Sequence, residues 1–194
     1  MEKYRDIRQA FWKDTFEKAL TYGPYLDASE GTHARKWRDM EGRLTVGEAE
    51  AATIQGFTRR LNVLCYSGVW CGDCVRQGPI FQKFAELAPS IDLRFAERVD
   101  GSTLAEELRI NGAYKVPVVV FLSEDFYELG RFGDRLLTVY RSMARRQLGA
   151  ACSSGLVPPP PDELRAEVAE WADVFERMHL ILRLSPMLRE RYQD

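Results

Sequence analysis

Scarce cysteine and histidine set the first limits on this chain of 194 residues, which has four cysteines and two histidines. Four cysteines in a chain of this length are too few for a scaffold stapled by disulfides. Two of them form one Cys-x-x-Cys motif, which favours a reducing compartment and a catalytic pair. A structural zinc site needs four ligands, and we expect none because the remaining candidates are not paired at ligand spacing. Those candidates are Cys65, Cys152, His33 and His179.

The sequence also lacks an excess of basic charge and a long apolar run, and we expect no secretory leader, the alternative being export by a signal removed before residue 1. Lys and Arg number 27 against 29 Asp and Glu, for a net charge of -2, and no basic stripe that would suit a nucleic acid is present. No run approaches the roughly 18 apolar residues of a membrane span. The charged residues 1–6 lack the apolar core of a signal peptide. We therefore expect no nucleic-acid partner, no membrane partner and a cytoplasmic location.

The most informative stretch that is present runs from Leu61 to Cys74. An apolar run ends at a Ser-Gly turn, and Trp70, Cys71 and Cys74 follow. The next segment has apolar residues at helical spacing, so Cys71 is predicted at a helix N-terminus. Free backbone N–H groups and the helix dipole favour a thiolate there, and the thiolate is the form that attacks disulfides. Cys74, one turn further on, can close a ring with Cys71.

The order of predicted elements around this stretch alternates helices and strands. Helices are predicted, from periodicity and end signals, over 2–22, 29–40, 46–57, 75–88, 103–110, 135–148 and 162–184, with a short one after Ser185-Pro186. Strands are predicted over 61–67, 91–99, 116–122 and 126–132. For the first three helices we expect an end at Tyr22-Gly23-Pro24, an N-cap at Ser29, and a capping box of Thr45 with Glu48.

The composition and the proline distribution predict four segments. An apolar fraction of 45% with 29% charged residues is typical of a soluble globular protein of one domain with additions. Residues 1–60 are predicted to be an N-terminal helical extension and 61–148 the core. Residues 149–161 contain four consecutive prolines and are predicted to be a stiff connector. Residues 162–194 are predicted to be a C-terminal helical extension that packs on the core.

The residues Trp70-Cys71-Gly72-Asp73-Cys74 resemble the active site of the thioredoxin-like family. Pro79 stands five residues after the second cysteine, where thioredoxins carry a helix-kinking proline, and Val116-Pro117 resembles their cis-proline dipeptide. The resemblance covers about residues 61–145. It implies an α/β, thioredoxin-like fold with a central four-stranded mixed sheet flanked by helices, here with helical extensions at both ends.

The resemblance also implies an activity and a role for each motif residue. Cys71 would be the nucleophile and Cys74 the resolving thiol of a dithiol–disulfide oxidoreductase, which needs no bound organic cofactor. Pro117 would be cis, and the backbone of Val116 would pair with a substrate segment as an added strand. Trp70 would either shield the cysteines and offer substrates a flat apolar surface or belong to the core. The substrate would be a protein or small-molecule disulfide, and a reductase or small thiols would supply electrons.

Two departures from the family pattern bear on the chemistry. Asp73 stands where thioredoxins usually have proline. Its carboxylate disfavours a nearby thiolate, so we expect a more ordinary Cys71 pKa than in strongly oxidising relatives, and a reductant or moderate exchanger. Cys65 stands where thioredoxins place a buried acid that takes the proton of the resolving cysteine. Asp73, Glu97 or water could take that role, and Cys65 is expected to be a small core residue.

Several alternatives remain open at the level of sequence. The chain could be a binding adaptor that uses its helical additions as an interface and has no catalysis. Cys152 could be a third redox thiol or an incidental cysteine. His179 is expected at a helix–helix contact, and the segment around it either folds back on the core or mediates a homodimer.

Overall fold

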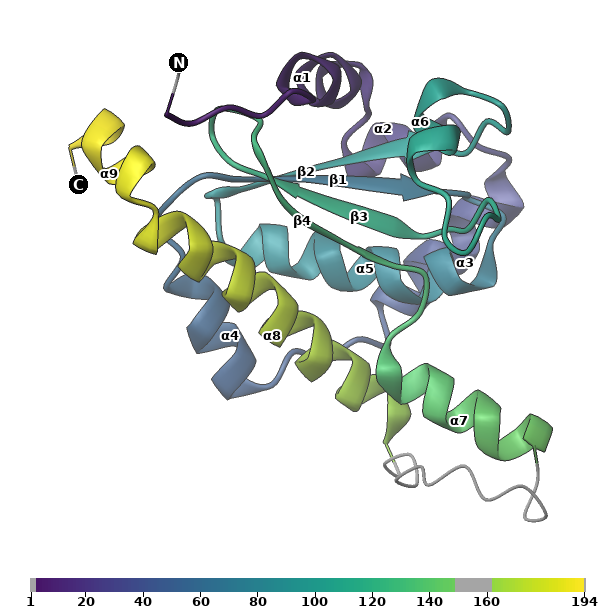
Figure 1. The fold of residues 1–194 in the computed structure, drawn as a ribbon. Helices are drawn as coiled ribbons and strands as arrows, with labels where there is room; N and C mark the ends of the chain where they lie inside the picture. The colour runs from purple at the N-terminus through teal and green to yellow at the C-terminus, as the bar shows by residue number, and fades with distance from the viewer. Residues whose placement is uncertain (1–2, 149–161, 194) are drawn as a thin grey trace.

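The computed structural model describes residues 3–148 and 162–193 and is built around one four-stranded sheet (Figure 1). The strand order is β2-β1-β3-β4, with β1 parallel to β2 and antiparallel pairing between β1 and β3 and between β3 and β4. The strands are β1 Leu61–Ser67, β2 Ile91–Glu97, β3 Val118–Leu122 and β4 Glu128–Gly133. This sheet and its flanking helices confirm the predicted fold class. The predicted connector 149–161 and Cys152 lie outside the described residues.

The central strands are where the sequence is most apolar. Every residue of β1 and of β3 is buried, as expected of strands covered on both faces. The parallel partners β1 and β2 are joined by a helix, α5 (Gly72–Leu87), because a parallel pair needs a long crossover. That crossover sets the start of α5 directly after the end of β1.

The helices form layers on both sides of the sheet. Figure 1 shows α3, α4, α5 and α8 on one side and α1 and α6 on the other. Besides α5, their bounds are α1 Gln9–Lys18, α2 Tyr22–Asp27, α3 Gly31–Glu41, α4 Glu48–Gln55, α6 Thr103–Glu107, α7 Leu137–Leu148, α8 Glu163–Leu184 and α9 Pro186–Tyr192.

The first predicted helix, 2–22, is wrong as a single element. The chain forms two helices, and Tyr22-Gly23-Pro24 begins α2 where we expected it to end α1. A proline in the first turn is compatible with a helix because the N–H it lacks has no intrahelical partner there. Between the helices, Leu20 exchanges two backbone hydrogen bonds with Phe95, of 2.9 and 2.7 Å, and so pairs with the edge strand β2.

Two predicted N-caps are also wrong. Glu30 precedes α3, and the Ser29 hydroxyl instead donates to the carbonyl of Leu26 at 2.6 Å. Gly47 precedes α4, with no side-chain cap, so Thr45 and Glu48 do not form a capping box. In each case the helix begins two residues later than predicted, at Gly31 and at Glu48.

The C-terminal helices cover the α5 side of the sheet. Trp171 and Phe175 of α8 are fully buried, and their rings contact Phe81 of α5, Phe121 of β3 and Phe132 of β4. The chain then turns at Ser185, whose hydroxyl accepts from the N–H of Leu188 and caps α9.

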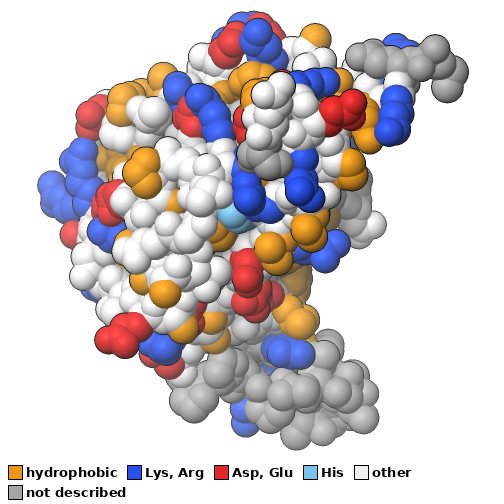
Figure 2. Space-filling view, turned by 90° about the vertical axis from the view of Figure 1, so that its left-hand side faces the viewer, with side chains coloured by type: hydrophobic (Ala, Val, Ile, Leu, Met, Phe, Trp, Pro, Cys, Tyr) orange, Lys and Arg blue, Asp and Glu red, His pale blue; other side chains and the backbone are white. Residues whose placement is uncertain are grey.

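Outside this core the surface is mixed. On the face shown in Figure 2, acidic and basic side chains are interspersed, and hydrophobic side chains occur singly or in small groups. Within residues 3–148 and 162–193, no helix has both the length and the apolar character to cross a membrane.

Candidate active site

Cys71 occupies the N-cap position of α5, directly before the first helical residue Gly72. Its backbone N–H donates to the carbonyl of Gly68 at 2.9 Å, and its carbonyl accepts from Val75 at 2.9 Å. These two bonds fix the turn that joins β1 to α5. The sulfur is half-buried and faces the free N–H groups of the first helical turn, a setting that stabilises negative charge.

Cys74 lies one turn further along α5 and is fully buried. Its sulfur accepts a hydrogen bond from the N–H of Gly68 at 3.4 Å. Cys65, Cys71 and Cys74 are all free thiols in this structure. The motif therefore pairs an accessible sulfur with a buried one.

The two sulfurs of the motif have opposite pKa shifts. The pKa of Cys71 is lowered from an ordinary value of 9.0 to about 6, chiefly by the hydrogen bond from Cys74, with help from the backbone N–H groups of Cys74 and Asp73. Burial and the Asp73 carboxylate act in the other direction on this pKa. Burial raises the pKa of Cys74 well above the ordinary value. At neutral pH the outer sulfur is thus mainly a thiolate and the inner one a thiol.

Asp73 is not an isolated charge beside Cys71. Its carboxylate forms an ion pair with the Arg135 guanidinium at 2.6 Å. Arg135 also lies 3.5 Å from the carboxylate of Asp134, which is 3.6 Å from the ammonium of Lys115. These pairs connect the start of α5 with the chain that leads into β3. Nothing in the sequence pattern pointed to Arg135, because it follows β4 and is far from the motif along the chain.

Val116 lies against the cysteine pair from the other side of the site. The Cys71 Sγ is 3.7 Å from the Val116 carbonyl oxygen, and the Val116–Pro117 peptide bond is cis. The structure thus brings Cys71, Cys74 and Val116 together from separate parts of the chain.

Trp70 is 51% exposed and stands at the rim of the site. Its indole packs on Gly68, where a Cβ atom would come within 2.9 Å of the ring. The Arg98 guanidinium lies over the same ring, 5.5 Å from its centroid. Trp70 therefore offers a flat apolar surface to solvent beside Cys71.

Trp37 of α3 also supports the active-site loop. It is fully buried, and its indole N–H donates to the carbonyl of Val69 at 2.9 Å. Gly78 of α5 makes room for this ring, since a Cβ there would lie 2.0 Å from it. Helix α3 thus helps to hold the loop that carries the cysteines.

The remaining candidate residues lie outside the site. His179 stacks on Phe57 with ring centroids 4.2 Å apart, and its Nε2 accepts from the N–H of Thr58 at 3.1 Å. Burial lowers its pKa, which keeps the imidazole neutral. Among the residues that the structure describes, no three His, Cys, Asp or Glu side chains gather as a metal site would require.

The fold and this site define a protein of the thioredoxin fold with a dithiol pair at a helix N-terminus. The family model described as thioredoxin matches residues 19–146, and the chain therefore belongs to the thioredoxin family. The match begins before α2, so it includes helices that our sequence resemblance left out. Among curated proteins none matches this chain.

Several solved structures are similar to this chain, over different lengths. A Pseudomonas aeruginosa protein of unknown function is 18% identical, with a TM-score of 0.68 over 86% of this chain and 95% of that one. An HIV epitope scaffold is 19% identical, with a TM-score of 0.59 over 86% of this chain and 92% of the scaffold. A thioredoxin from Fasciola hepatica is 25% identical over 49% of this chain and 88% of its own, with a TM-score of 0.33. The first two show that the fold, with most of its additional helices, recurs elsewhere.

Proposed function

We propose that this protein is a thiol–disulfide oxidoreductase that reduces or exchanges disulfides in other molecules. The thiolate of Cys71 attacks a substrate disulfide, which forms a mixed disulfide and releases one substrate sulfur as a thiolate. The sulfur of Cys74 then displaces the second substrate sulfur and closes the Cys71–Cys74 disulfide. Two electrons pass from the cysteine pair to the substrate.

The main support for this proposal is the difference between the two sulfurs of the motif. An accessible sulfur with a pKa of about 6 lies within hydrogen-bonding reach of a buried thiol whose pKa is raised. A pair of inert core cysteines would both be buried and both have raised pKa values. This difference between the two sulfurs suits the proposed reaction, in which Cys71 attacks the substrate first and Cys74 resolves the mixed disulfide afterwards.

The surroundings of Cys71 suit an extended substrate segment. The Val116 carbonyl is 3.7 Å from the attacking sulfur and offers backbone pairing, while Trp70 offers an exposed apolar surface. The substrate is a disulfide of a protein or of a small thiol. A disulfide reductase or a small thiol returns the two electrons, and we place the reaction in the cytoplasm.

Reduction of insulin disulfides with dithiothreitol as electron donor tests this function. Wild type should accelerate the reaction well above dithiothreitol alone, and Cys71→Ser should abolish the acceleration because the nucleophile is lost. Cys152→Ser, which leaves the motif intact, should retain it. A wild-type protein that gives no acceleration would favour the adaptor alternative.

A single-turnover trap examines the order of the two sulfurs. Cys74→Ser mixed with glutathione disulfide should accumulate one glutathione on Cys71, visible by intact mass, because no resolving thiol is left. Cys71→Ser should accumulate far less, since its only motif sulfur is buried. Equal labelling of the two variants would contradict the assigned roles.

A further inference from the structure

The buried thiol of Cys74 must lose a proton before it can attack the mixed disulfide. Cys74 is fully buried, and burial raises its pKa. Once Cys71 is bonded to a substrate, it no longer offers a thiolate that could take this proton. A base inside the protein, or a path to one, is therefore needed for fast resolution at neutral pH. The inference below rests on the proposed function.

Asp73 is badly placed for this role although it is next in sequence. Its carboxylate raises the pKa of Cys71, whereas the raised pKa of Cys74 comes chiefly from burial and from the neighbouring sulfurs of Cys71 and Cys65. It is also engaged by Arg135 at 2.6 Å.

A second series of polar groups begins near Cys74 and follows β1. This line consists of Cys65, Ser67, Tyr25 and Glu97. Cys65 and Ser67 are two residues apart on this strand and therefore point to the same face. Cys65 is close enough to Cys74 to raise its pKa. The Ser67 hydroxyl lies next to Cys65 and next to the Tyr25 hydroxyl, and it lowers the pKa of each. Both Cys65 and Ser67 are fully buried.

In this series of groups, the hydroxyl of Ser67 lacks a hydrogen-bond partner within the part of the chain that the structure describes. Its hydroxyl oxygen has no partner with complete hydrogen-bond geometry among the described residues. A buried hydroxyl without a fixed partner is free to turn between the sulfur on one side and the phenol on the other.

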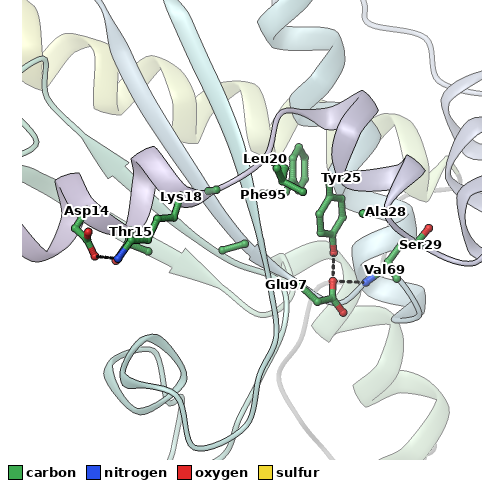
Figure 3. Close-up of a pocket in the computed structure, with 12 residues that line it drawn as sticks. Asp14, Thr15, Lys18, Leu20, Tyr25, Ala28, Ser29, Val69, Phe95 and Glu97 are labelled. Atoms are coloured by element: carbon green, nitrogen blue, oxygen red, sulfur yellow. Dashed lines mark hydrogen bonds and ion pairs between the residues drawn. The ribbon is translucent and has the colours of Figure 1, made fainter.

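The line ends at Glu97. The Tyr25 hydroxyl donates a short hydrogen bond to the Glu97 carboxylate, which also accepts from the N–H of Val69 at 3.2 Å (Figure 3). Sheet register explains the meeting, since Glu97 at the end of β2 pairs with Ser67 at the end of the parallel strand β1. Burial raises the pKa of Tyr25, so this phenol stays protonated and can pass a proton on without ionising.

Glu97 also has a route to solvent. It is exposed and lines a cavity of about 520 Å³ between β2 and the helices α1 and α2. Of the charged groups of other elements, Lys18 and Asp14 of α1 line this cavity and are paired with each other at 2.7 Å. Its neighbour Arg98 is paired with Asp100 at 2.6 Å. These pairings engage the nearby charges with one another, and the Glu97 carboxylate is held by the hydrogen bonds from Tyr25 and Val69.

We infer that Glu97 is the proton acceptor for Cys74, reached through Tyr25, Ser67 and Cys65. In the resolving step each group passes on one proton, so that Glu97 gains a proton and Cys74 becomes a thiolate. The Cys74–Cys71 bond forms, the bond between Cys71 and the substrate sulfur breaks, and the substrate leaves as a thiolate. Glu97 then releases its proton into the cavity. Over the two steps together, two electrons pass from the cysteine pair to the substrate disulfide.

Rapid mixing with a symmetric nitroaromatic disulfide separates the two steps, because each releases one coloured thiolate. Glu97→Gln should leave the first release unchanged and slow the second roughly 10- to 100-fold at neutral pH, at the lower end of what positioned bases contribute. In Glu97→Gln, the rate of the second release should then increase in proportion to the hydroxide concentration. In wild type this rate should vary little with pH. The glutamine side-chain oxygen can still accept the hydrogen bonds from Tyr25 and Val69, so we expect the variant to fold normally.

Tyr25→Phe provides the second variant. Phenylalanine retains the stacking of this ring on Phe95, at 5.1 Å between centroids, and removes only the bridging hydroxyl. It should reproduce the slow, hydroxide-dependent second release although Glu97 is present. Glu17→Gln, which removes an exposed carboxylate of α1 outside the line, should behave as wild type.

The outcomes separate this inference from the proposed function. A wild type without a first release would refute the function itself. A normal first release together with an unchanged second release in both Glu97→Gln and Tyr25→Phe would overturn the relay and leave the function standing. If the second release were slowed only in Asp73→Asn, the proton acceptor would be Asp73 and not Glu97.

Discussion

At the scale of single residues, the behaviour of the site depends on how charge is balanced around Cys71. The Cys74 thiol and the backbone N–H groups lower the Cys71 pKa, and the Asp73 carboxylate raises it. Arg135 neutralises much of that carboxylate at 2.6 Å. Asp73 thus raises the Cys71 pKa, as expected from the sequence, but the hydrogen bonds that lower this pKa have the larger effect. A stabilised thiolate makes the reduced pair more stable and the disulfide form more oxidising.

The first prediction at this scale concerns alkylation of Cys71. The reaction rate should follow the thiolate fraction, so it should rise with pH through a midpoint at about 6, below the ordinary value of 9.0. Asp73→Asn should lower the midpoint and Arg135→Gln should raise it, each by up to about one pH unit, because the sites are partly exposed. The rate of iodoacetamide labelling at Cys71, followed by peptide mass, measures the midpoint.

The double variant Asp73→Asn/Arg135→Gln is the matched control. Without the carboxylate, loss of the guanidinium should shift the midpoint very little, because the two charges act on Cys71 as a pair. Shifts that simply add would mean that Arg135 acts on Cys71 independently, and the ion pair would not be the cause.

At the scale of elements, the sequence predicted the parts that depend on local apolar pattern. The buried run of β1, the helix start after Cys71 and the cap at Ser185 follow from patterns that neighbouring residues set. The ends of α1 and α3 did not follow, because Leu20 pairs with β2 through a long-range contact and the Ser29 hydroxyl bonds back to Leu26 instead of capping α3.

The same reasoning explains which site residues were missed. The motif identified Cys71 and Cys74 as candidates because their spacing is a local property. Arg135, Trp37 and Tyr25 reach the site only after the chain folds, and none belongs to a local pattern. Glu97 was one of three proposed bases, and only the contact with Tyr25 distinguishes it.

The contact between α3 and α5 supports a prediction about stability. Gly78→Ala would put a Cβ 2.0 Å from the fully buried Trp37 ring, so the ring or the helix must move. We expect a loss of about 1–3 kcal/mol or more in the free energy of unfolding, as for other overpacked cores. We also expect slower insulin reduction, since Trp37 holds the Val69 carbonyl. Urea unfolding followed by circular dichroism measures the first effect.

Gly31→Ala is the matched control for this substitution. Gly31 is the first residue of α3, and a Cβ there meets nothing within 4 Å. Its free energy of unfolding should stay within about 0.5 kcal/mol of wild type. Equal losses in the two variants would show that close packing against Trp37 is not what requires glycine at position 78.

At the scale of the whole molecule, the helical additions and the core share one interior. The buried apolar residues form a single cluster that reaches from Trp12 of α1 to Leu188 of α9. Phe175 of α8 contacts rings on α5 and β3, and Leu20 pairs with β2. The segment boundaries predicted at 60 and 162 are therefore expected to be boundaries of sequence pattern and not of independent folding.

This shared interior predicts that the additions unfold together with the sheet. If α8 left the rest, the fully buried rings of Phe81, Phe84 and Phe121 would lose their cover, and exposing that much apolar surface is unfavourable. Hydrogen exchange with mass spectrometry across a urea series should therefore give one midpoint for peptides from α1, β1 and α8. An earlier midpoint for α8 alone would mean that the C-terminal helices form a separate unit. Comparison of the reduced and oxidised protein adds a control, because the Cys71–Cys74 disulfide closes a ring too small to link the elements. The midpoints should then shift together, in the same direction for all three peptides.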